Sequence, residues 1–290
     1  MIKYGKKASG MKIECVGVVI KPGGSELKPI YKRIKKVFEK EGIKVTLDKA
    51  SAQIISERDG MSFDQMCKKC DLLVSLGGDG TLLSVARRSY PYHKPVLGIN
   101  VGRLGFLTDI HPDDMPEFVK RLKKEEYRID TRMMIEVSIL GKKEKIVAFN
   151  DVVFTRPAVS KMIHIETFTN DTLLNSYYGD GLIIATPTGS TAYNLSAGGP
   201  VVYPFLEAFI FTPICPHSLT QRPLVLPADF EIKVTTKSKS ALIVVDGQDM
   251  YEFTPQDIVI VKKAPVGAKL IHRVERNYFN VLREKLGWGI

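Results

Sequence analysis

Hydrophobic side chains in the first part of the chain follow two alternating periodicities. Short apolar runs of strand length are separated by segments in which apolar residues recur every three or four positions, as along one face of a helix. Strands that alternate with helices of this length favour a parallel sheet. The predicted strands are residues 14–20, 44–47, 71–76 and 95–99, and the predicted helices are 27–41, 81–89 and 112–124.

The pattern changes near residue 127, where strand-like runs separated by turn residues replace the helices. Apolar residues regain helical spacing only over residues 274–286, which predicts a C-terminal helix that packs back on the body of the protein. The chain therefore divides into an α/β domain with a Rossmann-like parallel sheet (1–126), a β-rich domain (127–273) and the returning helix (274–290). The strand-like runs are 134–140, 145–149, 162–169, 181–185, 230–235, 241–245 and 258–262.

Composition supports a globular protein with a large core, because 44% of the 290 residues are hydrophobic. No apolar run approaches membrane-spanning length. The basic segment at residues 1–10 is not followed by a hydrophobic signal segment, so we expect a cytoplasmic protein. Met11 offers an alternative start, which would make the first ten residues a loose extension.

The formal net charge of +10 suggests nucleic acid as one class of partner. Acidic residues interrupt most of the basic clusters, and aromatic residues are not interleaved with them as a base-stacking surface requires. We therefore expect solvated charged surfaces and no nucleic-acid partner, with a positive field that attracts a small anionic substrate. Among the four cysteines, Cys67 and Cys70 form one CxxC, which lacks the second pair that a zinc site needs and fits helical spacing.

A glycine-rich turn follows the apolar run 72–76 and reads Gly77-Gly78-Asp79-Gly80-Thr81. Glycines let backbone N–H groups approach a ligand closely, which suits phosphate oxygens. The lysine of a GxxxxGK[ST] loop is missing, and a carboxylate stands in the turn instead. Because a carboxylate repels phosphate, we expect Asp79 to face a magnesium ion or a hydroxyl group that is about to be phosphorylated. This pattern indicates a kinase.

Three further segments carry polar groups suited to a ligand. Residues 180–200 form an apolar strand that runs into a turn dense in hydroxyl groups, where exposed N–H groups can hold a heterocycle or an anion. The pair Asn150-Asp151 is read either as a turn or as polar groups aimed at ribose hydroxyls or a base edge. Asp246-Gly247 predicts a β-hairpin. No Ser/His/Asp triad or metal-ligand cluster emerges from the spacing.

Taken together, these motifs resemble those of the NAD kinase family over most of the chain. They are GGDGT (77–81), NVGRLGFL (100–107), Asn-Asp (150–151), DGLIIATPTGSTAY (180–193), SAGGP (196–200) and DGQ (246–248). GGDGT alone is shared with diacylglycerol kinases, sphingosine kinases and 6-phosphofructokinases, members of one superfamily. TPTGSTAY after GGDGT is more specific.

The resemblance implies transfer of a phosphoryl group from ATP or polyphosphate to the 2′-hydroxyl of the adenosine ribose of NAD, giving NADP, with Mg²⁺ accompanying the donor. It implies Asp79 as the catalytic base and no protein residue as a metal ligand. Asp180 is implied to reach a neighbouring subunit's site, so a homodimer or homotetramer is expected. The residues implied in binding are Gly77, Gly78, Gly80, Phe106, Asn150, Asp151, Lys161, Asp180, Thr188, Thr191, Ala192, Tyr193, Ser196 and Gln248.

Two other functions are weighed beside this one. A lipid or sphingoid-base kinase would need an apolar membrane-contacting segment, for which the sequence offers no candidate, so we expect no membrane partner. A dinucleotide sensor without turnover would leave Asp79 without a task. Tyr178 stands where some relatives have arginine, which leaves the choice between NAD and NADH open.

Overall fold

The computed structural model describes residues 6–7, 11–102, 105–158 and 161–289. The chain forms two compact units. The first comprises residues 1–131 and 268–290, and the second comprises residues 132–267. Most of residues 1–10, which the sequence predicts to be a loose extension, lie outside the described residues. Arg103 and Leu104 of the glycine-rich motif also lie outside them.

The first unit contains a seven-stranded sheet that is parallel from β19 to β3. Its central strands β4 and β2 are buried at every position, which explains why they read as continuous apolar runs. The carboxyl ends of β4 and of its neighbour β5 lead into the two glycine-rich turns. In spatial order the strands are β1 (Lys6–Lys7), β6 (Arg128–Arg132), β19 (Ala268–His272), β5 (Val96–Asn100), β4 (Leu72–Gly77), β2 (Cys15–Ile20) and β3 (Lys44–Leu47).

The helices of this unit begin at residues that cap them. Asp48 accepts the Ser51 N–H at the start of α2, and Ser62 with Gln65 forms a capping box on α3. Helical spacing for the CxxC pair is confirmed: Cys67 lies in α3 and Cys70 follows its last turn, both as buried thiols. The helices are α1 (Lys28–Lys40), α2 (Lys49–Ile54), α3 (Phe63–Lys69), α4 (Asp79–Arg88), α5 (Met115–Lys123) and α7 (Tyr278–Leu286), with 3-10 turns at Ser25–Leu27, Tyr90–Tyr92 and Pro112–Asp114.

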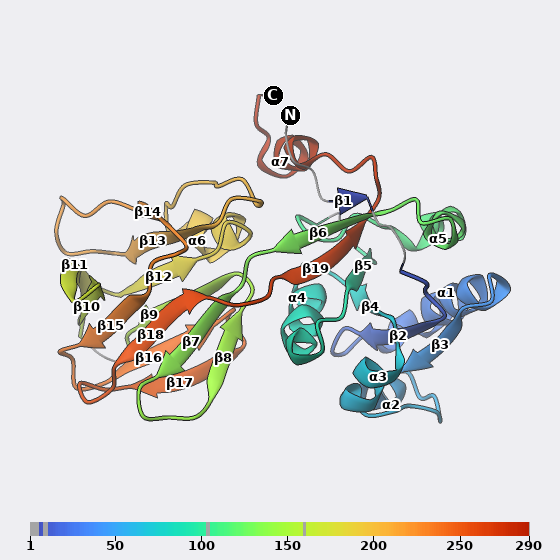
Figure 1. Cartoon of the computed structure of the whole chain (residues 1–290), viewed down its shortest axis with the longest axis horizontal. Coiled ribbons are helices and arrows are strands. Elements are labelled where there is room, and N and C mark those ends of the chain that lie inside the picture. The colour runs from blue at the N-terminus through green and yellow to red at the C-terminus, as the bar shows by residue number, and fades with distance from the viewer. Residues whose placement is uncertain (1–5, 8–10, 103–104, 159–160, 290) are drawn as a thin grey trace. The chain divides into compact units, whose positions relative to one another are not determined.

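Two strands differ from the sequence-based division. Strands β6 and β19 belong to the sheet of the first unit, whereas the sequence-based division places both segments in the β-rich domain. Figure 1 shows β19, in red, beside β5, and the two pair in parallel with Leu270 opposite Val96. This pairing joins segments far apart in the chain, so local pattern could not reveal it. Helix α7 begins at Tyr278 rather than at 274, because the Asn277 side chain caps it.

The second unit contains two six-stranded sheets, and every pairing that the described residues make in them is antiparallel. The unit is therefore β-rich, as predicted. One sheet is β11 (Thr172–Gly179), β10 (Ile163–Thr169), β15 (Ile232–Thr236), β18 (Val259–Lys263), β7 (Ile135–Ile139) and β8 (Lys145–Ala148); the other is β14 (Leu224–Pro227), β13 (Ala208–Ile214), β12 (Gly181–Ala185), β9 (Asp151–Thr155), β16 (Ala241–Val245) and β17 (Asp249–Phe253).

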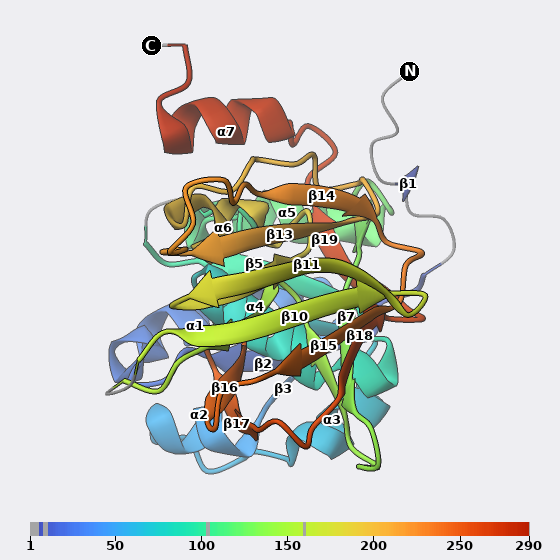
Figure 2. The ribbon, with the colours of Figure 1, turned by 90° about the vertical axis from the view of Figure 1, so that its left-hand side faces the viewer.

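One hydrophobic core joins the two sheets of this unit. Figure 2 shows β10 beside β11 and β15, and the inward residues of this sheet alternate with more exposed ones. Ile165 of β10 and Phe154 of β9 belong to the same buried cluster. Strands β9 and β12 are buried on both faces over nearly their whole length, so they form the rigid centre of the sheet that carries the polar turns.

No helix among the described residues is long and apolar enough to cross a membrane.

We expect Phe154→Ala to destabilise the second unit strongly. The ring is fully buried and lies edge-on to Phe253 with the ring centroids 5.5 Å apart, so truncation leaves a cavity. The expected loss in the free energy of unfolding is about 3–5 kcal/mol by chemical denaturation. Leu219→Ala is the control, because Leu219 is 91% exposed and its truncation should change stability by less than about 0.5 kcal/mol. Equal losses in both variants would contradict this assignment of the core.

Candidate active site

Asp79 is the first residue of α4 and follows the carboxyl end of β4. The GGDGT turn therefore lies where ligands bind in open parallel sheets, as predicted. Gly77 must be a glycine, because a Cβ there would come within 2.3 Å of the Thr81 hydroxyl. Negative charge is also favourable at the start of a helix, where N–H groups lack partners.

The Asp79 carboxylate is held by the loop at residues 105–108. Oδ2 accepts the Phe106 N–H at 2.7 Å, and Oδ1 accepts the Thr108 N–H at 3.0 Å and its hydroxyl at 2.7 Å. The Leu107 N–H lies 3.2 Å from both oxygens. These donors occupy most of the lone-pair positions of a carboxylate and fix its orientation.

A second layer fixes the donors themselves. Asn100, at the end of β5, accepts the Gly102 N–H and donates through Nδ2 to the Thr108 hydroxyl at 2.9 Å. The Thr108 oxygen thus already accepts one hydrogen bond, and its own proton is directed to Asp79. Gly105 permits the close approach, because a Cβ there would lie 2.0 Å from Asp79 Oδ1. The Phe106 carbonyl in turn accepts a hydrogen bond from Arg276.

In the second unit, the Asn150-Asp151 pair forms a turn that a carboxylate organises. Asp246 accepts the N–H groups of Phe149, Asn150 and Asp151 at 2.7, 2.7 and 3.0 Å. Asp246 has a left-handed φ of 50° in the predicted hairpin between β16 and β17, which the structure confirms. Sequence reasoning treated this aspartate as a hairpin residue only; its contact with the earlier turn has no local signal.

Asp151 is 4% exposed, and its surroundings make it a titrating group near neutral pH. Burial, followed by the negative charge of Asp246, raises the pKa of Asp151 to about 7. Perturbed carboxyl groups of this kind concentrate at functional sites. The side chain can thus either accept or donate a proton at physiological pH.

The hydroxyl-rich turn folds against the same segment. Thr186 accepts the Gly189 N–H and donates to the Phe149 carbonyl, and a Cβ on Gly189 would lie 2.1 Å from the Asn150 carbonyl. Ser190 is fully buried and bonded within the turn. These buried hydroxyls are structural. Thr191, Tyr193 and Ser196 are partly or largely exposed, in the 3-10 turn Gly189–Thr191 and the short helix α6 (Tyr193–Ser196).

A pocket of about 360 Å³ collects residues from three of the predicted motifs. Its volume suits part of a small ligand, and its walls combine apolar strand residues with a few polar groups. Asn150, Asp151, Ala192 and Tyr193 were predicted from sequence, while Asp246 was weighed only as a hairpin residue. The described lining is Asn150, Asp151, Val153, Thr155, Ala192, Tyr193, Val244, Asp246 and Gly247.

Other predicted residues have surroundings of their own. Asp180 accepts from Arg156, with Nε 2.7 Å from Oδ1, so Arg156 is a partner that sequence reasoning missed. Thr188 is buried, whereas Lys161 and Gln248 are exposed. None of these lies in the described lining of the pocket.

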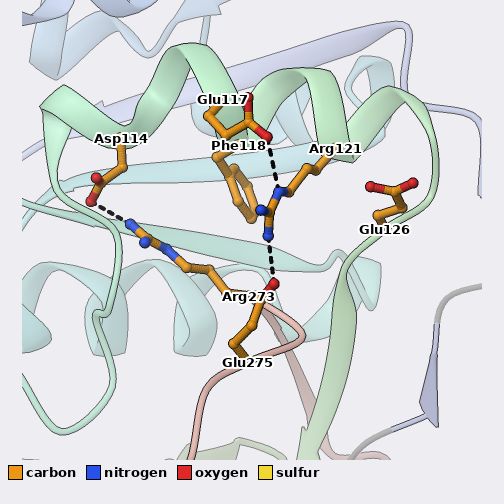
Figure 3. Close-up of a pocket in the computed structure, with 7 residues that line it drawn as sticks. All are labelled: Asp114, Glu117, Phe118, Arg121, Glu126, Arg273 and Glu275. Atoms are coloured by element: carbon orange, nitrogen blue, oxygen red, sulfur yellow. Dashed lines mark hydrogen bonds and ion pairs between the residues drawn. The ribbon is translucent and has the colours of Figure 1, made fainter.

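The first unit has a separate charged pocket of about 330 Å³. Figure 3 shows Arg121 between Glu117 and Glu275, and Arg273 directed at Asp114. Each arginine already faces a carboxylate, so this pocket offers a ligand no cation that is free of a counter-ion. Its chemistry is that of a surface ion-pair network, and it is the weaker candidate despite its comparable size.

The described residues contain no cluster of three His, Cys, Asp or Glu side chains that could hold a metal ion. Asp79 is the one carboxylate in the glycine-rich turns of the first unit, and backbone donors occupy its oxygens.

Comparisons with known proteins identify the family of this chain. A family model of the ATP-NAD kinase N-terminal domain matches residues 16–127, and one of the ATP-NAD kinase C-terminal domain matches residues 149–273. The NAD kinase of Wolinella succinogenes is 52% identical over 277 residues, covering 94% of this chain and 95% of that protein. That of Sulfurimonas denitrificans is 50% identical, covering 96% and 98%.

Two solved structures share the fold. Yeast NADH kinase complexed with NADH has a TM-score of 0.86 and 25% identity, covering 96% of this chain and 88% of that one. An NAD kinase from Archaeoglobus fulgidus in complex with ATP has a TM-score of 0.76 and 28% identity, covering 94% and 98%. The first unit carries the glycine-rich turns and the second carries the hydroxyl-rich turn. This combination is that of a phosphotransferase of the kinase class. The chain belongs to the NAD kinase family.

We expect Gly105→Ala to lower turnover by at least about tenfold, because the new methyl group would displace the Asp79 carboxylate or the loop that holds it. NADP formation by the purified variant is the measurement. Gly102→Ala is the matched control in the same segment, since its Cβ would meet only Asn100 Oδ1, at 3.8 Å. Turnover of Gly105→Ala equal to that of the control would show that the close approach is dispensable.

Proposed function

We propose that this protein transfers a phosphoryl group to the 2′-hydroxyl of the adenosine ribose of NAD and so forms NADP. The observation that carries the proposal is the oriented carboxylate of Asp79 at the start of α4, within turns that match the NAD kinase family. Phosphoryl transfer depends mainly on positioning and charge stabilisation, and the rigid hydrogen bonds to Asp79 serve positioning.

The two units have separate tasks in this proposal. The first supplies Asp79 as the base that receives the proton of the attacking hydroxyl, with Gly80 and Phe106 near that hydroxyl. Gly77 and Gly78 belong to the same binding turn. An aspartate is a weak base toward an alcohol, but in a loose transition state the proton leaves late.

The second unit binds the dinucleotide. Its pocket suits the adenosine part: Tyr193 offers a stacking face, and Asn150 and Asp151 offer hydrogen-bonding groups at the pocket wall. Thr188, Thr191, Ala192 and Ser196 belong to the adjoining turn. Asp180, Lys161 and Gln248 are assigned to outer parts of the dinucleotide, with Asp180 near the nicotinamide.

ATP is the phosphoryl donor that the Archaeoglobus relative's ATP complex supports, and polyphosphate is the alternative. Mg²⁺ is proposed to arrive on the donor's phosphates, because this ion keeps several waters and is commonly bound through substrate phosphates. It would neutralise charge on the phosphates. No step is assigned to a metal held by the protein.

Three finer features complete the proposal. We assign the protein to the cytoplasm, as a homodimer or homotetramer in which Asp180 reaches a neighbouring site. We also assign helix α7, whose Val281 and Leu282 are buried, the role of closing the first unit.

Asp79→Asn is expected to keep the fold and most of the affinity for NAD while turnover falls by about 10²–10⁴-fold, the usual contribution of a general base. Purified protein is incubated with NAD, Mg²⁺ and either ATP or polyphosphate, and an NADP-specific dehydrogenase reads the product. Calorimetric titration with NAD checks binding. Near-normal turnover would remove Asp79 from the role of base, and wild-type binding of NAD without any product would favour a sensor.

The pH dependence of NAD use should report Asp151. Because its pKa is raised to about 7, the carboxylate loses its charge as the pH falls below that value and can no longer accept two hydrogen bonds from NAD. We expect kcat/KM for NAD to fall below pH 7, by up to about tenfold per pH unit. In Asp151→Asn this fall of kcat/KM below pH 7 should be absent. Asp229→Asn, at an exposed position, is the control that should retain it. The same fall of kcat/KM in Asp151→Asn would assign the pH dependence to another group.

A further inference from the structure

A buried group of charged side chains lies on the other side of the loop that holds Asp79. Its central member is Arg276, which follows β19 and is 8% exposed. Arg276 Nη2 donates to the Phe106 carbonyl, and its Nε lies 3.8 Å from Asp109 Oδ2. One guanidinium therefore hydrogen-bonds the start of the segment 106–109 and lies within ion-pair distance of the carboxylate at its end. The N–H groups of residues 106–108 hold the catalytic carboxylate.

The Phe106 residue links the two interactions directly. Its N–H donates to Asp79 Oδ2 at 2.7 Å, and its carbonyl accepts from Arg276. Since the carbonyl and the N–H belong to the two planar peptides that flank one α-carbon, a displaced guanidinium would turn the backbone that points at Asp79. Arg276 is thus connected to the Asp79 carboxylate through a single intervening residue, Phe106.

His272 fixes the orientation of Arg276. His272 Nδ1 lies 3.0 Å from Asp109 Oδ1, and Arg276 Nη1 contacts the imidazole ring. Burial, reinforced by the charge of Arg276, lowers the pKa of His272 to about 4, so the ring is neutral at physiological pH. Arg276 Nη1 lies near both ring nitrogens, 2.8 Å from Nδ1. Because the Asp109 carboxylate can only accept, its contact favours the tautomer with the proton on Nδ1, which leaves Nε2 as the acceptor for Arg276.

A second arginine fixes the backbone of the first. Arg128 Nη1 donates to the Arg276 carbonyl at 3.1 Å, and Arg128 Nε lies 2.8 Å from Asp130 Oδ1, with both side chains buried. Around the neutral His272, two carboxylates (Asp109 and Asp130) face two guanidiniums (Arg128 and Arg276). These four side chains balance in charge, and Arg273 adds a further positive charge near Asp109.

Stability alone does not explain such a group. Removing charges from water is costly, and buried ion pairs are often no more stable than apolar residues that fill the same volume. What a planar, always charged guanidinium with several fixed donors supplies is directional holding of a backbone carbonyl and a carboxylate at once. That property matters where geometry limits the reaction.

We propose that Arg276 is a positioning residue for phosphoryl transfer, which clamps the 106–109 segment and through it fixes the orientation of the Asp79 carboxylate. The inference rests on the role of base proposed above for Asp79. Arg276 touches neither NAD nor the donor in this assignment, so its loss should act on the chemical step and leave ground-state binding nearly intact.

The first test compares Arg276→Gln and Arg276→Lys with the control Arg33→Gln. Arg33 is an exposed arginine of α1 in the same unit, and it pairs with Asp113 at 2.8 Å. We expect kcat to fall by about 100-fold in Arg276→Gln and about tenfold in Arg276→Lys, with KM for NAD and ATP changed by less than about twofold. The control should keep both parameters. A rise in KM at unchanged kcat, or equal losses in Arg276→Gln and the control, would overturn the proposal.

A double-mutant cycle with Asp79→Asn shows whether Arg276 acts through that carboxylate. If it does, adding Arg276→Gln to Asp79→Asn should slow the residual turnover by less than about twofold, measured by end-point NADP at high enzyme concentration. A further 100-fold loss would mean that Arg276 acts independently. Near-normal turnover of Asp79→Asn alone would instead refute the proposed base, and normal turnover of Arg276→Gln beside an inactive Asp79→Asn would refute only this inference.

Amide hydrogen exchange gives a readout that needs no turnover. In Arg276→Lys, peptides covering residues 105–110 should exchange at least about tenfold faster than in wild type, while those of α1 stay unchanged. Unchanged protection of 105–110 would contradict the clamp. Should the Arg276 variants not fold, Asp109→Asn, which removes the carboxylate between His272 and Arg276, is measured in the same way and carries the same expectations.

Discussion

The active-site geometry of the first unit depends on one interaction, the binding of the Asp79 carboxylate by the N–H groups of residues 106–108. A buried or half-buried carboxylate must be compensated, and here successive amides and one hydroxyl do so. The interaction constrains both partners: β4 and α4 set the position of Asp79, while β5 sets where the loop begins. Gly105 is the consequence, since any side chain would occupy the space of the carboxylate.

The second unit solves a similar problem with the same chemistry. Asp246, in a tight hairpin, binds three successive N–H groups of the 149–151 turn, just as Asp79 binds those of 106–108. The cost appears at Asp151, where the nearby negative charge and burial oppose ionisation. The way in which Asp246 holds the turn therefore produces a carboxyl group, Asp151, whose charge changes near neutral pH. This group lies in the wall of the ligand pocket.

Sequence patterns predicted the strands and helices that local periodicity encodes, and the glycine and hydroxyl motifs that belong to the NAD kinase family. They did not reveal that β6 and β19 pair within the sheet of the first unit, because their partners there lie in distant segments of the chain. They also missed residues that act through tertiary contacts. Arg156 pairs with Asp180, and Arg276 holds the Phe106 carbonyl from 170 positions away. No spacing rule reports such contacts.

The missed residues share a physical character that explains why sequence patterns did not reveal them. Each is an arginine whose carboxylate or carbonyl partner lies elsewhere in the chain. The partner offsets the desolvation of the guanidinium only after folding has brought the two together. Local sequence patterns therefore contain no sign of the pairing. Because the orienting groups of the first unit are charged and buried, its catalytic geometry depends on the completed sheet: β19 delivers His272 and leads into Arg276 only when it pairs with β5. The alignment of Asp79 thus requires that β19 has paired with β5.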